Sequence, residues 1–204
     1  MKKITAFLLS SIALFVFFAA PAMSATANQT PVTSPKLSKV FSDAMRGSKY
    51  YMKYTVITDM GGQKMKTKGI TGVDGKTIGA EIFMEQMNMK TRSLVKDGNM
   101  YMIDDATKTY RVMPLQQGAT QQSGTADYSA IKFTGSGNGT IEGKTLPYEE
   151  YTVNNVVMRY YIDGAKLYAI ETKMNNMTTV MLIEEFSTNV PAELLNLPQG
   201  YQAL

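Results

Sequence analysis

The side chains of this chain that could do chemistry are above all its methionines. The stretch from Ile82 to Met113 carries six of them, and the 204-residue chain contains 16 methionines but no histidine and no cysteine. A thioether is a soft metal ligand, and it is also a flexible apolar group that adapts to irregular partners. The pattern therefore indicates either soft-metal binding or a surface that can pack around an apolar ligand.

Soft-metal binding is the alternative hypothesis. The spacing Met84-x-x-Met87-x-Met89 could gather three sulfur atoms for Cu(I) or Ag(I), the ions that thioethers prefer. A Met-x-Met pair such as Met100 and Met102 places both sulfur atoms on one face of a strand. The three residues could not converge if Met87 and Met89 faced solvent while Met84 faced the core.

Catalysis is not expected from this sequence. The carboxylate pairs Glu149-Glu150 and Glu184-Glu185 could do acid–base chemistry, but sequential residues on a strand point to opposite faces. We therefore expect these pairs to be solvated strand positions. Without histidine or cysteine neither a Ser-His-Asp nor a Cys-His site can be built, and the chain has no phosphate-binding loop. The sequence predicts a non-enzyme that uses no cofactor.

An apolar binding surface is the leading hypothesis. Its candidate residues lie in strand-like segments, where they would line a cavity between a sheet and a cap. The competing interpretation is that they fill an ordinary sheet–helix core. A single helix cannot cover a sheet of about ten strands, and this favours the cavity. The candidate ligand-binding residues are Met52, Tyr54, Met84, Met100, Met102, Met113, Met158 and Met181.

Alternation at period two predicts that most of the chain forms strands. Asp-Gly pairs at 74–75, 97–98 and 163–164 separate alternating runs, which is a strong hairpin signal. Consecutive hairpins predict an antiparallel sheet of about ten strands, and a sheet of that size must curl. The segment 190–204 is expected to form one helical turn and a tail packed on the sheet.

One amphipathic helix is predicted before the strands, over residues 35–46. Ser34 and Pro35 are suited to the N-cap and the first helical position. Leu37, Val40 and Phe41 then recur at helical spacing, and Gly47 ends the pattern. These three apolar residues are the candidate cap over the binding face, together with the 114–130 loop.

The first 27 residues have the pattern of a secretory signal peptide. Lys2 and Lys3 precede an apolar run that is short for a membrane span, and small residues follow. We expect a periplasmic or secreted protein with a flexible lead-in at 28–34, a single domain at 35–204 and no transmembrane anchor in the mature chain. Loss of the two lysines lowers the formal charge from +4 to +2, so no nucleic-acid partner is expected.

Two segments of the sequence resemble those of the LolA/LolB/LppX-like superfamily of periplasmic lipoprotein carriers and lipid-binding proteins. They are VKDGNMYMIDDATKTYRVMPL, which begins at Val95, and YYIDGAKLYAIETKMNNMTTVMLIEEFSTNVPAELLNLPQGY, which begins at Tyr160. The resemblance covers about 49–201. It rests on turns and aromatic residues and includes no reactive motif.

The resemblance implies a mainly β (α+β) fold with an unclosed half-barrel of antiparallel strands, an N-terminal helix and short helical caps. It also implies a carrier or sensor whose hydrophobic cavity receives a lipid or a lipoprotein acyl chain. Lipoproteins or envelope membrane proteins would then be further partners.

Overall fold

The computed structural model describes residues 49–60, 62–115, 132–153, 156–174 and 177–204. The predicted signal peptide, the lead-in and the helix of 35–46 with its cap residues Leu37, Val40 and Phe41 lie outside the described residues. Strands and two short 3-10 helices make up the regular structure of the described part. No helix within these ranges is long and apolar enough to cross a membrane.

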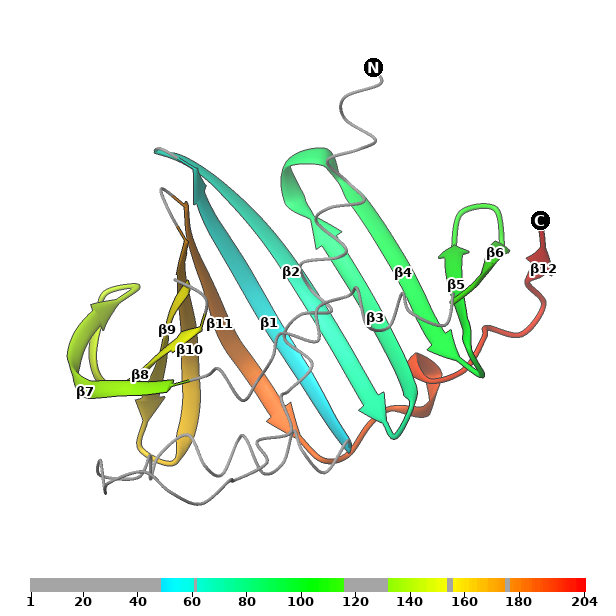
Figure 1. Ribbon diagram of the computed structural model, residues 1–204. Helices are drawn as coiled ribbons and strands as arrows, with labels where there is room; N and C mark the ends of the chain where they lie inside the picture. The colour runs from blue at the N-terminus through cyan, green and yellow to red at the C-terminus, as the bar shows by residue number, and fades with distance from the viewer. Residues whose placement is uncertain (1–48, 61, 116–131, 154–155, 175–176) are drawn as a thin grey trace.

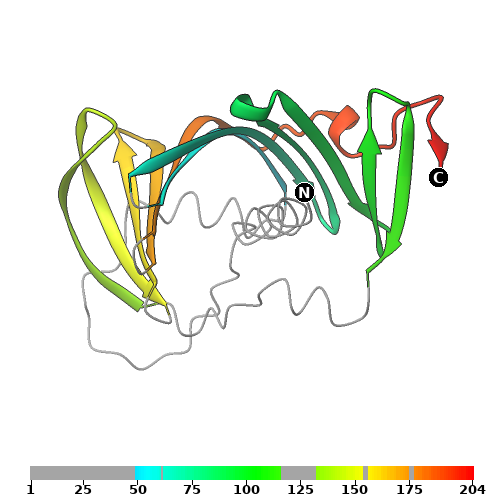
Figure 2. The same cartoon turned by 90° about the horizontal axis from the view of Figure 1, so that it is seen from above.

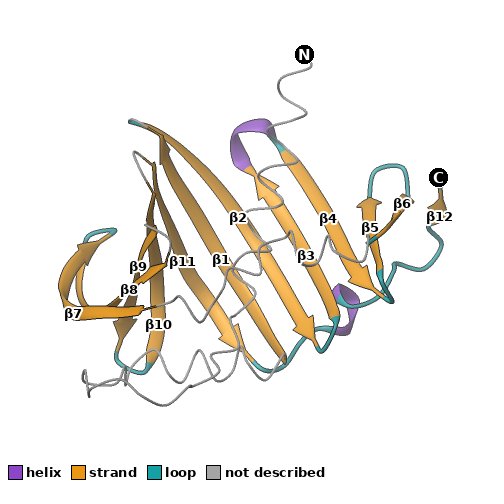
Figure 3. Ribbon diagram, in the orientation of Figure 1, coloured by secondary structure: helices purple, strands orange, loops and turns teal. Residues whose placement is uncertain are grey.

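All the strands belong to one sheet (Figures 1 and 3). Its order is β12-β6-β5-β4-β3-β2-β1-β11-β10-β9-β8-β7, and every pair is antiparallel except β12 with β6. The strands are β1 (Lys49–Met60), β2 (Gln63–Asp74), β3 (Thr77–Met84), β4 (Met89–Lys96), β5 (Asn99–Asp104), β6 (Thr109–Pro114), β7 (Lys132–Ile141), β8 (Lys144–Val153), β9 (Val156–Asp163), β10 (Lys166–Met174), β11 (Met177–Ser187) and β12 (Gln202–Ala203). The 3-10 helices are η1 (Glu85–Met87) and η3 (Ala192–Leu194).

The sheet bends into an open arc whose edge strands β7 and β12 do not meet (Figure 2). Strands β1 and β11 are paired at its centre and join two sets of consecutive hairpins. The predicted unclosed, curved antiparallel sheet is therefore confirmed, with twelve strands in place of about ten. The two additional strands are β4, which η1 separates from β3 without a Gly or Pro signal, and the two-residue β12. Asn88, at φ 46°, makes that turn in the left-handed region.

The three Asp-Gly hairpins are confirmed. They connect β2 to β3, β4 to β5 and β9 to β10. Gly75, Gly98 and Gly164 all have positive φ, between 60° and 74°, and glycine adopts this conformation without steric cost. Local turn chemistry thus sets which strands become neighbours.

The predicted C-terminal turn is η3, and it packs on the outer face of the arc (Figure 2). A Cβ atom at Gly79 would clash with the backbone carbonyl of Leu194, and one at Gly72 would meet the side chains of Val190 and Leu194. The guanidinium of Arg92 also donates a hydrogen bond to the carbonyl of Glu193. The face that carries Gly72 and Gly79 is therefore the convex face, and it holds the C-terminal segment.

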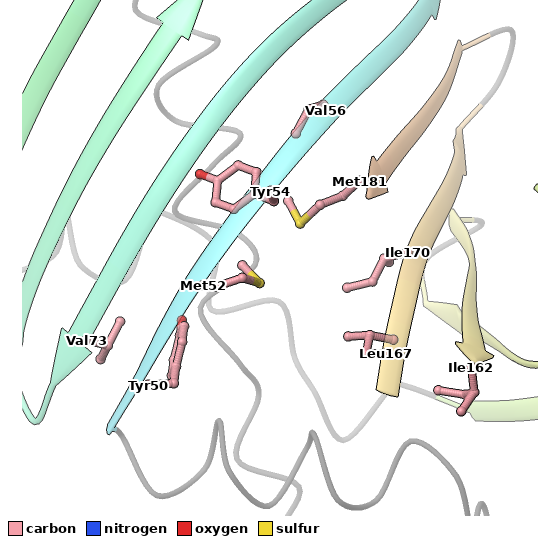
Figure 4. Packing of buried hydrophobic residues seen from close by; sticks show 9 residues of the cluster. All are labelled: Tyr50, Met52, Tyr54, Val56, Val73, Ile162, Leu167, Ile170 and Met181. Atoms are coloured by element: carbon pink, nitrogen blue, oxygen red, sulfur yellow. The ribbon is translucent and has the colours of Figure 1, made fainter. Parts of the chain in front are cut away.

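The residues that alternate with those of the convex face along each strand point into the concave face. They include the largest cluster of buried side chains, which spans β1, β2, β9, β10 and β11 (Figure 4). Its members are Tyr50, Met52, Tyr54, Val56, Val73, Ile162, Leu167, Ile170 and Met181. A second cluster, which includes Leu146, Tyr161 and Ala169, lies on the convex side of the β7–β10 limb.

Gly79→Ala should destabilise the protein by about 1–3 kcal/mol and loosen the C-terminal segment, because backbone and not a flexible side chain blocks the added methyl group. Urea unfolding would give the loss of stability, and limited proteolysis would detect release of the segment after Ser187. Gly135→Ala is the matched control, since a Cβ on this strand glycine meets no atom within 4 Å. Equal stability of the two variants would contradict the assigned role of Gly79.

Candidate apolar binding face

The pairing register brings all eight predicted ligand-binding residues to one face of the sheet. Met52 and Tyr54 alternate on β1, and Met181 pairs with Val56 two residues further on. The other five belong to the same face because each is connected to these residues through successive cross-strand partners. The five are Met84, Met100, Met102, Met113 and Met158. That they bind a ligand remains a prediction.

The concave face is almost free of charge. Along the described strands, the charged residues that the register assigns to it are Asp104, Arg111 and Glu149. The carboxylate of Asp104 accepts hydrogen bonds from the backbone N–H groups of Ala106 and Thr107, so it belongs to the β5–β6 turn. The rest of the face presents apolar, tyrosine, threonine, serine and glycine residues and the two amides Gln63 and Asn138.

The convex face carries the charges instead, and many of them are paired. On one limb Arg159 contacts Glu150 at 2.8 Å and Glu171 at 3.7 Å. The Arg159–Glu150 hydrogen bond lowers the pKa of Glu150 and raises the pKa of Arg159. At the centre of the sheet, a hydrogen bond from Thr55 and an ion pair with Lys53 lower the pKa of Glu184.

The candidate residues differ in burial along the arc. At the centre, Met52 and Met181 are 4% and 1% exposed, so they fill the core of the concave face. On the β4–β6 limb, Met100 and Met102 are half-buried and Met113 is 43% exposed. The methionines at the centre are therefore core residues, whereas those on the limb are accessible to a ligand. We call Met100, Met102 and Met113 the methionine limb.

Tyr54 is fixed at the centre by its neighbours. Its ring lies against Gly69, where a Cβ would overlap it, and its hydroxyl shares a hydrogen bond of 3.2 Å with Thr71. Burial raises the pKa of the Tyr54 phenol, so the hydroxyl stays protonated at neutral pH. Together with Thr71 it places two hydroxyl groups at the centre of the concave face.

The residues of the alternative metal site lie at the facing ends of β3 and β4 and on η1 between them. Met84 and Met89 pair directly across the β3–β4 hairpin and are half-buried. Met87 lies on η1 and is 50% exposed. No group of histidine, cysteine or carboxylate residues that could hold a metal ion occurs in the described part of the chain. The site made by Met84, Met87 and Met89 remains a prediction.

Two residues of the concave face were not anticipated from the sequence. Glu149, expected at a solvated position, is buried, and its carboxylate accepts a hydrogen bond from the Tyr151 hydroxyl at 3.2 Å. That expectation is wrong because β8 turns Glu149 inward, opposite Tyr160 of β9. Arg111 was also missed, although its position two residues before Met113 assigns both to one face of a strand.

No family model matches the sequence, and the comparison with curated proteins gives no match. Among solved structures, an uncharacterized conserved protein from Thermus thermophilus is 8% identical, with a TM-score of 0.49 over 82% of this chain and 97% of that one. LprF from Mycobacterium bovis is 10% identical, with a TM-score of 0.42 over 82% and 98%.

A third solved structure is the LolA superfamily protein NE2245 from Nitrosomonas europaea. It is 10% identical, with a TM-score of 0.38 over 74% of this chain and 90% of that one.

Truncation should separate the two kinds of methionine. Met181→Ala should lower the free energy of unfolding by about 2–5 kcal/mol, because it empties a fully buried position. Met102→Ala removes the same atoms from a half-buried position on the same face, and should cost about 1 kcal/mol or less. Chemical denaturation measures both. A comparable loss at Met102 would show that the methionine limb is part of the packed core.

Proposed function

We propose that this chain is an exported carrier or binding protein for an apolar ligand such as a lipid or a lipoprotein acyl chain. The ligand lies on the concave face, beneath the cap predicted from Leu37, Val40 and Phe41. One observation carries the proposal, namely the partition of charge between the two faces of the sheet. The convex face is dense in ion pairs, whereas the concave face carries almost no charge.

The methionine limb supports this function through its accessibility. Burial of apolar surface contributes about 25 cal/mol per Å² before the cost of ordering the ligand is subtracted. Met100, Met102 and Met113 lie on neighbouring strands and retain exposed surface. Flexible thioethers can also repack around chains of different length and shape. A set of related acyl chains therefore fits this surface better than one rigid small molecule.

Location and partners follow from the same proposal. The predicted signal peptide of residues 1–27 favours the periplasm or the outside of the cell. A carrier there exchanges its cargo with lipoproteins or envelope membrane proteins. The proposed action is non-catalytic and requires no cofactor, because binding and release of an apolar chain break no covalent bond.

Met102→Glu should weaken uptake of an apolar probe roughly tenfold or more, because it replaces an apolar contact on the binding face, opposite Arg111, by a carboxylate that must lose water when the probe binds. The probe is N-phenyl-1-naphthylamine, a neutral dye whose fluorescence rises in an apolar site, titrated into the delipidated full-length mature protein. Val112→Glu is the matched control, because Val112 is 43% exposed on β6 and belongs to the convex face.

The folding of both variants would be followed by circular dichroism and thermal unfolding. The proposal predicts that Val112→Glu binds the dye within about twofold of wild type, while Met102→Glu folds but binds poorly, as expected of a charge placed in an apolar site. Equal dye binding by the two variants, or unfolding of Met102→Glu alone, would argue that the methionine limb is core and not a binding surface.

A further inference from the structure

We propose that Arg111 binds the anionic head of an amphiphilic ligand whose apolar chain lies on the methionine limb. This inference rests on the proposed function and specifies its ligand class, an apolar chain that ends in a carboxylate or a phosphate. The shared chemistry is an oxyanion, which a guanidinium binds through two parallel hydrogen bonds.

The register places Arg111 among the methionines. It lies on β6 directly opposite Met102 of β5, and the neighbouring pair on the same face is Met100 with Met113. Arg111 is exposed, so its guanidinium can reach solvent while its aliphatic stem covers apolar surface. A chain lying along these methionines would therefore carry its head group to Arg111.

Arg111 differs from the other described arginines in its surroundings. Arg92 and Arg159 belong to the convex face, where both contact carboxylates, Glu81 and Glu150 respectively. Arg111 makes no ion pair or side-chain hydrogen bond with any described residue, and it is the one cation that the register assigns to the concave face of the described strands.

The carboxylates near Arg111 have other partners. Asp104 caps the β5–β6 turn by accepting two backbone N–H groups. Asp105 contacts Lys90 and Arg92 and accepts a hydrogen bond from Tyr201 at 2.9 Å. Glu149, the remaining acid of the concave face, is buried on the opposite limb. The positive charge of Arg111 is thus available to a ligand.

The test compares three twelve-carbon competitors that differ only in the head group. Dodecanoate carries a carboxylate, dodecyl phosphate carries a phosphate, and dodecanol is neutral. Each displaces N-phenyl-1-naphthylamine from the delipidated protein. The variants are Arg111→Gln, which removes the charge, and Arg111→Lys, which keeps the charge without the planar fork. Lys132→Gln is the control, because it removes one charge from the convex face of β7, at the far end of the sheet.

Arg111→Gln should weaken displacement by dodecanoate and dodecyl phosphate about five- to tenfold, the low end for a charge-assisted hydrogen bond because Arg111 is exposed. Displacement by dodecanol should stay unchanged. Arg111→Lys should recover part of the loss, and Lys132→Gln should behave as wild type. Added salt should reduce the preference of wild type for the anions. The larger of the two anion effects identifies carboxylate or phosphate as the natural head.

Other outcomes overturn the inference. Equal weakening of all three competitors would mean that Arg111 only supports the shape of the face, and no weakening would mean that it does not contact the ligand. In both cases wild type still binds dodecanol, so the proposed function stands. If dye and dodecanol both fail to bind wild type, the proposed function itself is wrong.

Discussion

Alternation of side chains across a single sheet is the constraint on which the rest of this structure depends. Every strand sends consecutive residues to opposite faces, so one register determines the surroundings of all of them. Here that register sends ion pairs to the convex face and apolar residues to the concave face. A slip of one residue between β1 and β2 could place Lys68 opposite Tyr54 and Lys66 opposite Val56. The charge partition therefore stabilises the register while it creates an apolar surface.

Curvature gives the two faces different surroundings. The convex face is held by the C-terminal segment, whose close approach is possible because Gly72 and Gly79 have no side chains. The concave face holds Met52 and Met181 in its packed centre and the accessible methionine limb at one side. The same residue type thus occurs in two environments of the same face, one buried and one accessible. The exceptions to the partition are Asp104 and Arg111 on one limb of the arc and Glu149 on the other.

Local sequence signals predicted most of the fold. The alternation and the Asp-Gly pairs gave the hairpins, and the run through Val190 to Leu204 gave the C-terminal turn. The break at Asn88 was missed because a 3-10 turn without Gly or Pro has no strong local signal. The pairing of β1 with β11 joins segments more than a hundred residues apart, and no local pattern encodes such a contact.

The residues of the candidate site could be predicted from the sequence, but the burial of each residue could not. The eight candidate residues share one face in the register, as the alternation at period two indicates, since this property is local to each strand. Which of them are buried depends on where the sheet bends, and so Met181 and Met113 could not be separated from the sequence. The burial of Glu149 was missed for the same reason, because only tertiary packing brings it under the aromatic residues of β8 and β9.

Native mass spectrometry of the mature protein would show whether the concave face holds an apolar ligand. The protein would be purified from its own envelope without detergent, so that any ligand present is one that it acquired there. We expect the protein to carry an added mass that organic solvent extracts as a lipid or an acyl-chain compound. A protein that carries no added mass, takes up no lipid and gains mass only with Cu(I) or Ag(I) would contradict this expectation.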